Sequence, residues 1–416
     1  MNTLPQSKES TNMNTRRTFL KTMLAAGSAP LVFPSLSSAA HHEKKIKLGI
    51  IGCGGRGQWI ADLFQKHGGY ELVAGADYFQ NRLDQYSLRF KVPAKKCYSG
   101  LNGYKKLIES GGVDAVAIIS PPYFHPEQAE AAVKAGKQVY LAKPIAVDVP
   151  GSLSIKESGA LATSRGLTYL VDFQTRANEF FIEAVKRVHD RALGKLCFGE
   201  SFYHANDPFK NAPEVLGPDP SNPENRLRVW GVDRTLSGDI ITEQNIHTLD
   251  VMSWIMNKDP IKARGTFNQK VRPWGNCSDH FSVIYDYGDG VDVSFTSRQF
   301  AAHGTKPDGI RNRMFGEDGV LETQYSGPVL LRGIKESFYR GGDSSGLYES
   351  GAVNNIAAFH KAIMGGDAGN TTVGPSVQSN LVTILGREAA YSGKTVTWKK
   401  LLKSKKSLEL DLDLTV

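Results

Sequence analysis

The amino-acid sequence predicts a two-domain α/β protein, in which a domain with a parallel sheet precedes an α+β domain with a mostly antiparallel open sheet. Two observations support this fold class. Short apolar strands alternate with helices from Lys45 onward, a pattern typical of parallel sheets with helical crossovers. Beyond about Thr175 the pattern changes to long polar loops and strands with two-residue periodicity, which indicates antiparallel strands with one solvated face.

The N-terminal domain is predicted to span residues 44–174. Apolar runs predict its strands, and 3.6-residue periodicity predicts its helices. We expect strands at 45–52, 70–77, 113–122, 138–144 and 166–174, and helices at 57–67 and 125–137. Gly136 closes the second helix and Pro144 ends the strand that follows it, as each residue type commonly does.

The C-terminal domain is predicted to span residues 175–398. A polar loop from Asn206 to Arg228 precedes the strand pair in "HFSVIYDYGDGVDVSFTSRQF", whose turn is Tyr287-Gly288-Asp289-Gly290. The tail 399–416 contains "LELDLDL". That tail segment has strand periodicity, and it predicts an edge strand, a subunit contact or an ordinary surface strand.

Residues 1–40 are similar to a twin-arginine export signal. Arg16 and Arg17 precede an aromatic residue, a leucine and Lys21, and no charged residue follows until after residue 40. Glycine and prolines interrupt the uncharged stretch, so we expect no stable membrane anchor. Ser38-Ala39-Ala40 matches a small-residue cleavage site. We therefore predict export by the twin-arginine route to the periplasm or another extracytoplasmic location.

Composition excludes several classes of function. The signal contains four basic residues and one acidic residue, so its removal lowers the formal charge from +8 to +5. Lysines are dispersed apart from a cluster in the tail, so the chain lacks the basic stripe of a nucleic-acid-binding protein. Cys53, Cys97, Cys197 and Cys277 are widely spaced. They predict no metal site and require no disulfide.

A glycine-rich turn directly follows the first predicted strand and opens a helix. Its residues are Gly52, Cys53, Gly54, Gly55, Arg56 and Gly57, which fit G-x-G-x-x-G. Such a turn lets a pyrophosphate approach backbone N–H groups at a helix N-terminus, as in Rossmann domains. Asp77 ends the second strand, where an acid binds the adenosine ribose and repels a 2′-phosphate. We therefore predict NAD as the cofactor; Arg82 nearby partly favours NADP, the alternative.

Two later segments resemble the Gfo/Idh/MocA family of glucose-fructose oxidoreductase and inositol dehydrogenase relatives. They are "VDAVAIISPPYFHPEQAEAAVKAGKQVYLAKPIA" and "SGDIITEQNIHTLDVMSWIM", within a resemblance that covers about 45–398. The family's Glu-Lys-Pro strand end is here Ala142-Lys143-Pro144. The resemblance implies an oxidoreductase with a nicotinamide cofactor. The expected cofactor contacts in these segments are Ser120, Pro121, Pro122, His125, Lys143 and Pro144, although His125 is equally suited to a core or capping role.

Catalytic roles follow from the chemistry of alcohol oxidation, which needs a base for the hydroxyl proton and positive charge near the developing alkoxide. Glu243 and His247 are four residues apart, so on one helix the carboxylate would orient the imidazole and favour its charged form. His247 is the predicted base. Lys143, at the carboxyl end of a strand, is predicted to stabilise the alkoxide or to help relay the proton. A hydrogen-bonded core face or a metal site that includes Asp250 remains an alternative.

Several aromatic and planar polar residues suit a sugar site. These substrate candidates are Arg176, Tyr203, His204, Arg228 and Trp230, besides Lys143 and His247.

We predict an exported, homo-oligomeric oxidoreductase that transfers hydride between a tightly bound NAD and a secondary alcohol carbon of a small carbohydrate. Free nicotinamide nucleotides are not expected outside the cytoplasm, so the protein must retain its cofactor between turnovers. The nicotinamide must then be returned to its starting oxidation state by a second substrate or within a single catalytic cycle. An NAD-dependent glycosidase, which oxidises, eliminates, hydrates and reduces its substrate, is the first alternative. A non-catalytic sugar-binding protein on a degenerate dehydrogenase fold is the second.

Overall fold

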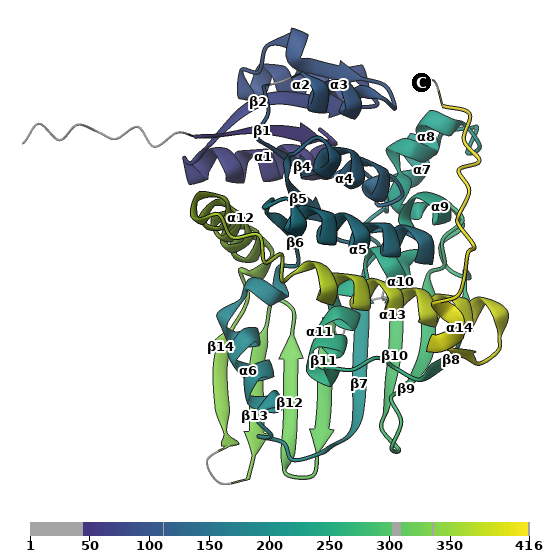
Figure 1. Ribbon diagram of the computed structural model, residues 1–416. Helices are drawn as coiled ribbons and strands as arrows, with labels where there is room; N and C mark the ends of the chain where they lie inside the picture. Colours follow the sequence, from purple (N-terminus) through teal and green to yellow (C-terminus); the bar gives the residue numbers. More distant parts are fainter. Residues whose placement is uncertain (1–44, 111, 302–308, 335–336, 415–416) are drawn as a thin grey trace, which may run out of the picture. The chain divides into compact units, whose positions relative to one another are not determined.

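The computed structural model describes residues 45–110, 112–301, 309–334 and 337–414. The predicted export signal lies outside these residues. Within them, a parallel sheet is built from the N-terminal part and a larger sheet from the C-terminal part (Figure 1). This arrangement confirms the predicted fold class.

The first sheet is parallel throughout, with strand order β3-β2-β1-β4-β5-β6. Its strands are β1 (Ile46–Ile51), β2 (Tyr70–Asp77), β3 (Cys97–Ser99), β4 (Ala115–Ile118), β5 (Gln138–Ala142) and β6 (Tyr169–Asp172). The connecting helices are α1 (Gly55–His67), α2 (Gln80–Phe90), α3 (Gly103–Glu109), α4 (His125–Lys134) and α5 (Val149–Ser164). Successive strands extend to opposite sides of β1, so a crevice opens where the carboxyl ends of β1 and β4 diverge.

A helix from the C-terminal part completes one face of this first sheet. Helix α12 (Leu347–Gly365) packs beside α1. Its buried Ile356 and Phe359 share a core with Phe64 and Tyr140, and the Tyr70 hydroxyl donates to the Ile356 carbonyl at 2.9 Å. The chain therefore returns to its first sheet after building the second.

The second sheet is antiparallel except where β7 pairs with β10. Its strands are β7 (Leu196–Ala205), β8 (Lys262–Asn268), β9 (His280–Asp286), β10 (Asp292–Gln299), β11 (Gly309–Gly316), β12 (Gly319–Gln324), β13 (Pro328–Gly333), β14 (Tyr339–Asp343) and β15 (Val396–Thr397). The predicted turn at 287–290 joins β9 to β10. Helices α6 (Glu179–His189), α11 (Ile246–Met256) and α13 (Val373–Ser392) pack on this sheet (Figure 1).

Short helices fill the loop region between β7 and β8. They are α7 (Ala212–Leu216), α8 (Pro223–Arg228), α9 (Arg234–Ser237) and α10 (Ile240–Glu243), with a 3-10 turn at Trp230–Val232. Two further 3-10 turns lie before β3, at Ala94–Lys96, and after β6, at Thr175–Ala177. Helix α14 (Trp398–Leu401) follows β15.

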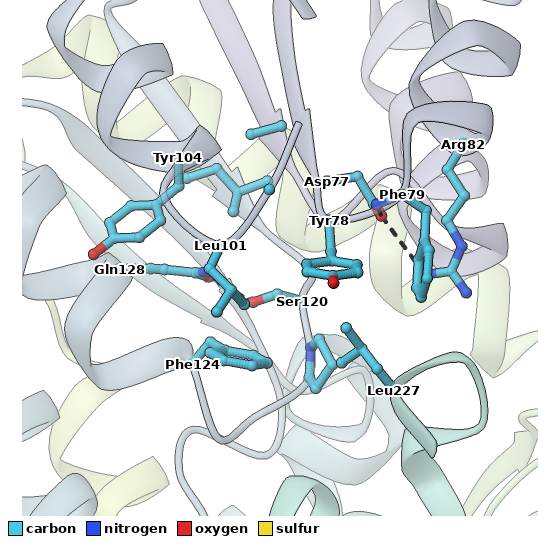
Figure 2. A pocket seen from close by; sticks show the side chains of 15 residues that line it. Asp77, Tyr78, Phe79, Arg82, Leu101, Tyr104, Ser120, Phe124, Gln128 and Leu227 are labelled. Carbon is cyan, nitrogen blue, oxygen red and sulfur yellow. Dashed lines mark hydrogen bonds and ion pairs between the residues drawn. The ribbon is translucent and has the colours of Figure 1, made fainter. Parts of the chain in front are cut away.

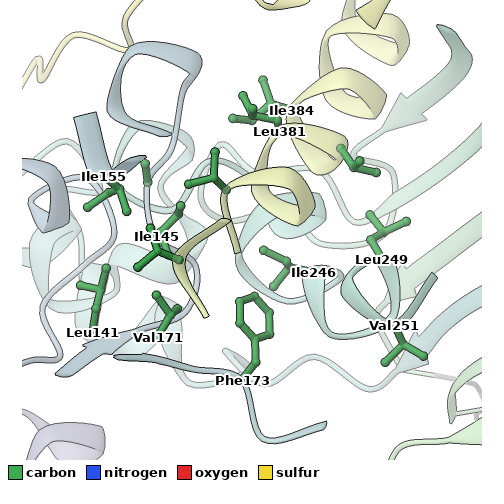
Figure 3. Close-up of a cluster of buried hydrophobic side chains, with 14 of the residues drawn as sticks. Leu141, Ile145, Ile155, Val171, Phe173, Ile246, Leu249, Val251, Leu381 and Ile384 are labelled. Carbon is green, nitrogen blue, oxygen red and sulfur yellow. The ribbon is translucent and has the colours of Figure 1, made fainter. Parts of the chain in front are cut away.

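One apolar core joins the two sheets (Figure 3). The first sheet contributes Leu141 of β5, Val171 of β6 and Phe173, which directly follows β6. These side chains lie opposite Ile246 of α11, and α13 adds leucine and isoleucine side chains to the same core. Burial of each large aliphatic side chain contributes about 1.5–3 kcal/mol. The alignment of the two sheets, and hence of the residues between them, rests on this shared core.

The C-terminal tail differs from the prediction. Residues 402–414 contain no strand; instead, the tail runs extended from α14 past α9 to α8 (Figure 1). Leu412 and Leu414 are buried against Phe79, Leu227 and Leu236. Alternating leucines produced the strand-like pattern, but they pack on helices and loops rather than pair with a sheet edge.

None of the helices in the described part of the chain is long and apolar enough to cross a membrane.

Candidate active site

The glycine-rich turn lies at the crevice between β1 and β4. Gly52 adopts a φ of 93°, and a β-carbon on it would lie 2.6 Å from the Ser120 backbone nitrogen. A β-carbon on Gly57 would lie 1.8 Å from the Gly52 carbonyl oxygen. These two glycines allow the turn itself to form, because any side chain would collide with backbone.

Gly54 and Gly55 have a different environment. A β-carbon on Gly54 would meet protein atoms only at 3.6 Å, and one on Gly55 would meet none within 4 Å. Both residues border the cavity at the start of α1. The fold itself would therefore tolerate a β-carbon at either position. The absence of a side chain leaves space for a ligand to approach the backbone. A pyrophosphate fits this feature, because the helix N-terminus offers N–H donors and positive dipole charge.

Asp77 closes the turn from the end of β2. Its carboxylate accepts hydrogen bonds from the backbone N–H groups of Cys53 at 2.8 Å and Phe79 at 2.9 Å. The Arg82 guanidinium is 3.8 Å away. Burial raises the pKa of Asp77, while the charges of Arg82 and Arg228 and the two N–H donors oppose that rise. Asp77 occupies the position at which Rossmann domains bind the adenosine ribose.

A pocket adjoins Asp77 at the end of β2, and we call it the β2 pocket (Figure 2). Aromatic and aliphatic side chains make up most of its wall: Tyr78, Phe79, Leu101, Tyr104, Phe124 and Leu227. Leu227 comes from α8, so the C-terminal part of the chain supplies one side of the pocket. A flat apolar wall beside a ribose-binding carboxylate suits an adenine ring.

A larger cavity of about 420 Å³ continues from this pocket across the ends of β1, β4, β5 and β6; we call it the central cleft. Its size lies within the roughly 300–1,000 Å³ of small-molecule sites. Lys143, Glu243 and His247 line it together with Ser120, Pro121 and Pro122. The fold thus brings the predicted catalytic residues to the predicted cofactor turn.

Lys143 bridges the two parts of the chain. Its ammonium donates to the Glu243 carbonyl oxygen at 2.8 Å and lies 3.7 Å from Glu243 Oε1. Burial lowers the pKa of Lys143, and the Glu243 carboxylate partly opposes that shift. Desolvation of an ammonium favours its neutral form, whereas the nearby carboxylate favours the charged form. Glu243 therefore holds Lys143 in position and favours its charged form.

The expected pairing of Glu243 with His247 is wrong. Glu243 ends α10 and His247 lies in the first turn of α11, so Gln244 and Asn245 interrupt the single helix that the four-residue spacing assumed. Glu243 Oε2 and His247 Nδ1 are both buried without a hydrogen-bond partner. Burial and the charges of Lys143 and Arg56 lower the pKa of His247 well below 6.5. These effects favour the neutral form of the ring, whereas the assumed pairing with Glu243 would favour its charged form.

Asp239 fixes the segment that carries Glu243. It caps α10 with a φ of 69°, and its side chain accepts from the backbone N–H groups of Ile240 and Ser278 and from the Tyr391 hydroxyl. The sequence contained a signal for this role, because aspartate directly before a helix is a common N-cap. Asp239 was nevertheless not among the predicted residues.

His125 is enclosed behind the cleft. Its ring nitrogens lie 2.9 Å from the Pro144 carbonyl oxygen and 2.7 Å from that of Ser120. Burial lowers the pKa of His125 to about 4. The ring is only 1% exposed, so it packs between the backbone of Ser120 and that of Pro144, both predicted cofactor contacts. A neutral imidazole donates a hydrogen bond to one of these two carbonyls.

Arg56 also lines the central cleft. Its guanidinium pairs with Asp172 at 3.1 Å and lies over the rings of Trp59 and Tyr348. Asp172 ends β6 and is buried beside Asn355 of α12.

The substrate candidates divide into two groups. Arg228 and Trp230 line the central cleft, and Tyr203 lies behind it, where its hydroxyl donates to Gln244 at 2.6 Å. Arg176 is outside the cleft lining and pairs with buried Asp250. His204 contacts Thr296 on the sheet face opposite Tyr203, because side chains alternate along β7.

Sequence reasoning missed further residues of the cleft wall: Asp172, Gln174, Pro208, Phe209, Gln244 and Tyr348. Asp172 and Gln174 could have been found, since Asp172 ends the last parallel strand and Gln174 follows it, at the edge where ligands bind. Phe209 and Tyr348 come from remote segments without a distinguishing pattern. Among the described residues, no group of three or more metal-ligating side chains is placed to hold a metal ion.

Two family models match the chain. The GFO/IDH/MocA oxidoreductase family model, with an NAD-binding Rossmann fold, matches residues 46–173, and the model of the GFO/IDH/MocA C-terminal domain matches residues 181–322.

Individual relatives are distant. A 1,5-anhydro-D-fructose reductase from Ensifer adhaerens is 24% identical over 70% of this chain and 81% of its own. A glycosyl hydrolase family 109 protein from Porphyromonas gingivalis is 25% identical over 44% of this chain and 41% of its own. The structure of scyllo-inositol dehydrogenase from Lactobacillus casei, with bound NAD(H) and scyllo-inositol, is 20% identical over 85% of this chain and 99% of its own, with a TM-score of 0.65.

We predict that alanine substitutions at two glycines of the turn separate folding from ligand binding. Gly57→Ala forces a backbone collision and should lower the free energy of unfolding by about 1–3 kcal/mol. Gly54→Ala fits the ligand-free fold, so its thermal unfolding should be unchanged, whereas its dissociation constant for NAD should rise at least about tenfold. Calorimetry and fluorescence titration measure the two effects. Unchanged NAD affinity in Gly54→Ala would contradict close approach of the cofactor there.

Proposed function

Because the chain belongs to the Gfo/Idh/MocA family of NAD-binding oxidoreductases, we propose that it oxidises a secondary alcohol of a sugar, polyol or glycoside in the central cleft. The observation that carries this proposal is that Lys143, Glu243 and His247 line one cavity with the glycine-rich turn. The residues that would hold NAD are Gly52 to Gly57, Asp77, Ser120, Pro121 and Pro122. Bound NAD supplies the hydride acceptor.

His247 is the proposed base. A neutral imidazole can accept the substrate hydroxyl proton, which then passes to solvent. The Lys143 ammonium supplies positive charge for the alkoxide that forms as the proton leaves. Glu243 is a positioning residue, since it holds Lys143 through its backbone carbonyl and its carboxylate.

We predict that His247→Ala lowers kcat by about 100- to 10,000-fold, the usual loss for a general base. Its dissociation constant for NAD should stay near that of the wild type, because the glycine-rich turn is untouched. Steady-state kinetics with a panel of polyols, together with NAD titration, gives both values. The exposed His189 provides the control, as His189→Ala should keep wild-type turnover. Near-normal turnover of His247→Ala would rule out His247 as the base.

We predict that Glu243→Gln shifts the pH profile of kcat. The Glu243 charge raises the pKa of Lys143, so an uncharged amide lowers that pKa further. Lys143 acts in its protonated form, and the alkaline limb of the profile should therefore move to lower pH. Glu109→Gln, at an exposed acid, should leave the limb in place. An unmoved alkaline limb in Glu243→Gln would contradict the pairing of Glu243 with Lys143.

The second candidate function is an NAD-dependent glycosidase. The similarity to part of a glycosyl hydrolase family 109 protein supports it, and the same base and lysine suit both reactions. Incubation with aryl glycosides and with free sugars separates the candidates: aglycone release favours the glycosidase, and reduction of the bound nicotinamide by a free sugar favours the oxidoreductase. Absence of both reactions would favour the third candidate, a non-catalytic sugar-binding protein.

Export by the twin-arginine route is also proposed, on the strength of Arg16, Arg17 and the uncharged segment after them. A protein exported in the folded state can carry bound NAD with it. We predict that the double variant Arg16→Lys, Arg17→Lys accumulates as uncleaved precursor inside the cell, measured by fractionation and immunoblotting. Normal export of this variant would overturn the assignment.

Assembly into a homo-oligomer is proposed through the open face of the second sheet. Phe198 and Ile284 are 42% and 54% exposed there, on the side opposite α11 and α13. We predict that Ile284→Asp lowers the molar mass measured by light scattering. A wild-type protein that is already monomeric would contradict this proposal.

A further inference from the structure

Helix α8 and the end of the tail lie together at the β2 pocket. We propose that Pro223–Arg228 and residues 408–414 form a clamp that retains the adenosine half of the cofactor between turnovers. We call this pair of segments the adenosine clamp. The inference rests on the proposed function, since it assumes that the protein holds NAD with its adenosine at Asp77.

The inner layer of the clamp is α8. Leu227 forms part of the β2 pocket wall. The neighbouring Arg228 places its guanidinium 3.8 Å from the centre of the Phe79 ring, the residue that follows Asp77 and Tyr78. The Tyr78 hydroxyl donates to Glu224 at 3.4 Å. Helix α8 thus closes the side of the pocket that β2 and its following loop leave open.

The outer layer is the tail. Leu412 and Leu414 are 9% and 8% exposed, and they pack with Leu227 and Phe79. The Arg226 guanidinium on α8 pairs with Asp411 of the tail at 3.0 Å. These contacts join α8 to the tail.

Further contacts anchor both segments. Arg226 also pairs with Asp233 at 2.7 Å, and Asp233 caps α9 through its side chain. The Leu408 backbone N–H donates to Asp148 at 2.9 Å, and Asp148 is the N-cap of α5 in the first domain. The tail is therefore held both at the N-terminus of α5 and at α8.

Movement of α8 away from the pocket exposes apolar side chains and separates the Arg226 ion pairs. A ligand enclosed by α8 must wait for this opening, so the clamp should slow dissociation of the dinucleotide. Slow dissociation is the property that an exported enzyme with a recycled cofactor requires. The alternating leucines of the tail, which do not form a strand, would then serve to hold the tail against α8.

The test measures release of NADH from the purified full-length protein and from variants, by stopped-flow fluorescence with excess NAD as the competitor. Deletion of residues 407–416 and the double variant Leu412→Ser, Leu414→Ser should each release NADH at least about tenfold faster, since two buried leucines stabilise the closed clamp. Leu402→Ser, at an exposed leucine of the same tail, is the matched control and should release NADH at the wild-type rate.

A second variant distinguishes an effect on NADH release from an effect of lost folding. Arg228→Met leaves the tail intact and removes the guanidinium that lies over Phe79 and also borders the central cleft. It should also release NADH faster, with an unchanged melting temperature in the absence of ligand. If the tail variants melt at lower temperature but release NADH at the wild-type rate, the tail is only a structural support and the clamp is refuted. Absence of NADH binding to the wild type would instead refute the proposed function itself.

Discussion

The contact between Lys143 and Glu243 is the interaction on which the candidate site depends. Lys143 follows β5 of the parallel sheet, and Glu243 ends α10 of the C-terminal part. Their hydrogen bond and ion pair lie at the edge of the apolar core that joins the two sheets. A buried ammonium is costly unless a carboxylate and a hydrogen-bond acceptor compensate it. The contact therefore joins the two parts of the chain and places Lys143 in the same cavity as His247 and the glycine-rich turn.

Other features of the fold hold the segments that carry Lys143 and Glu243 in position. The N-cap Asp239 fixes α10, His125 joins the carbonyls of Ser120 and Pro144, and α12 returns to cover the parallel sheet. None of these three features takes part in the proposed chemistry. They hold the β4 and β5 strand ends and α10 in positions from which proton transfer and charge stabilisation are possible.

Sequence patterns correctly predicted the elements that local periodicity determines. They failed for contacts that tertiary packing determines. The parallel sheet, the hairpin at 287–290 and the glycine turn follow from short-range signals. The Glu243–His247 bond was wrong because a four-residue spacing implies contact only if one helix continues through it, and the chain breaks at Gln244 and Asn245. Alternating leucines predicted a strand in the tail, yet packing on α8 satisfies the same pattern. Phe209 and Tyr348 line the cleft because tertiary packing brings their distant segments to it. The local sequence around either residue contains no pattern that predicts this position.

The central claim is that the central cleft transfers hydride from a secondary alcohol carbon to bound NAD. Its most direct test is a single-turnover reaction of the NAD-loaded protein with a polyol deuterated at its carbinol carbons, followed by mass spectrometry of the released nicotinamide cofactor. We expect one deuterium on the reduced nicotinamide and slower reduction than with the unlabelled polyol. Reduced cofactor without deuterium, or no reduction by any sugar or polyol tested, would contradict it.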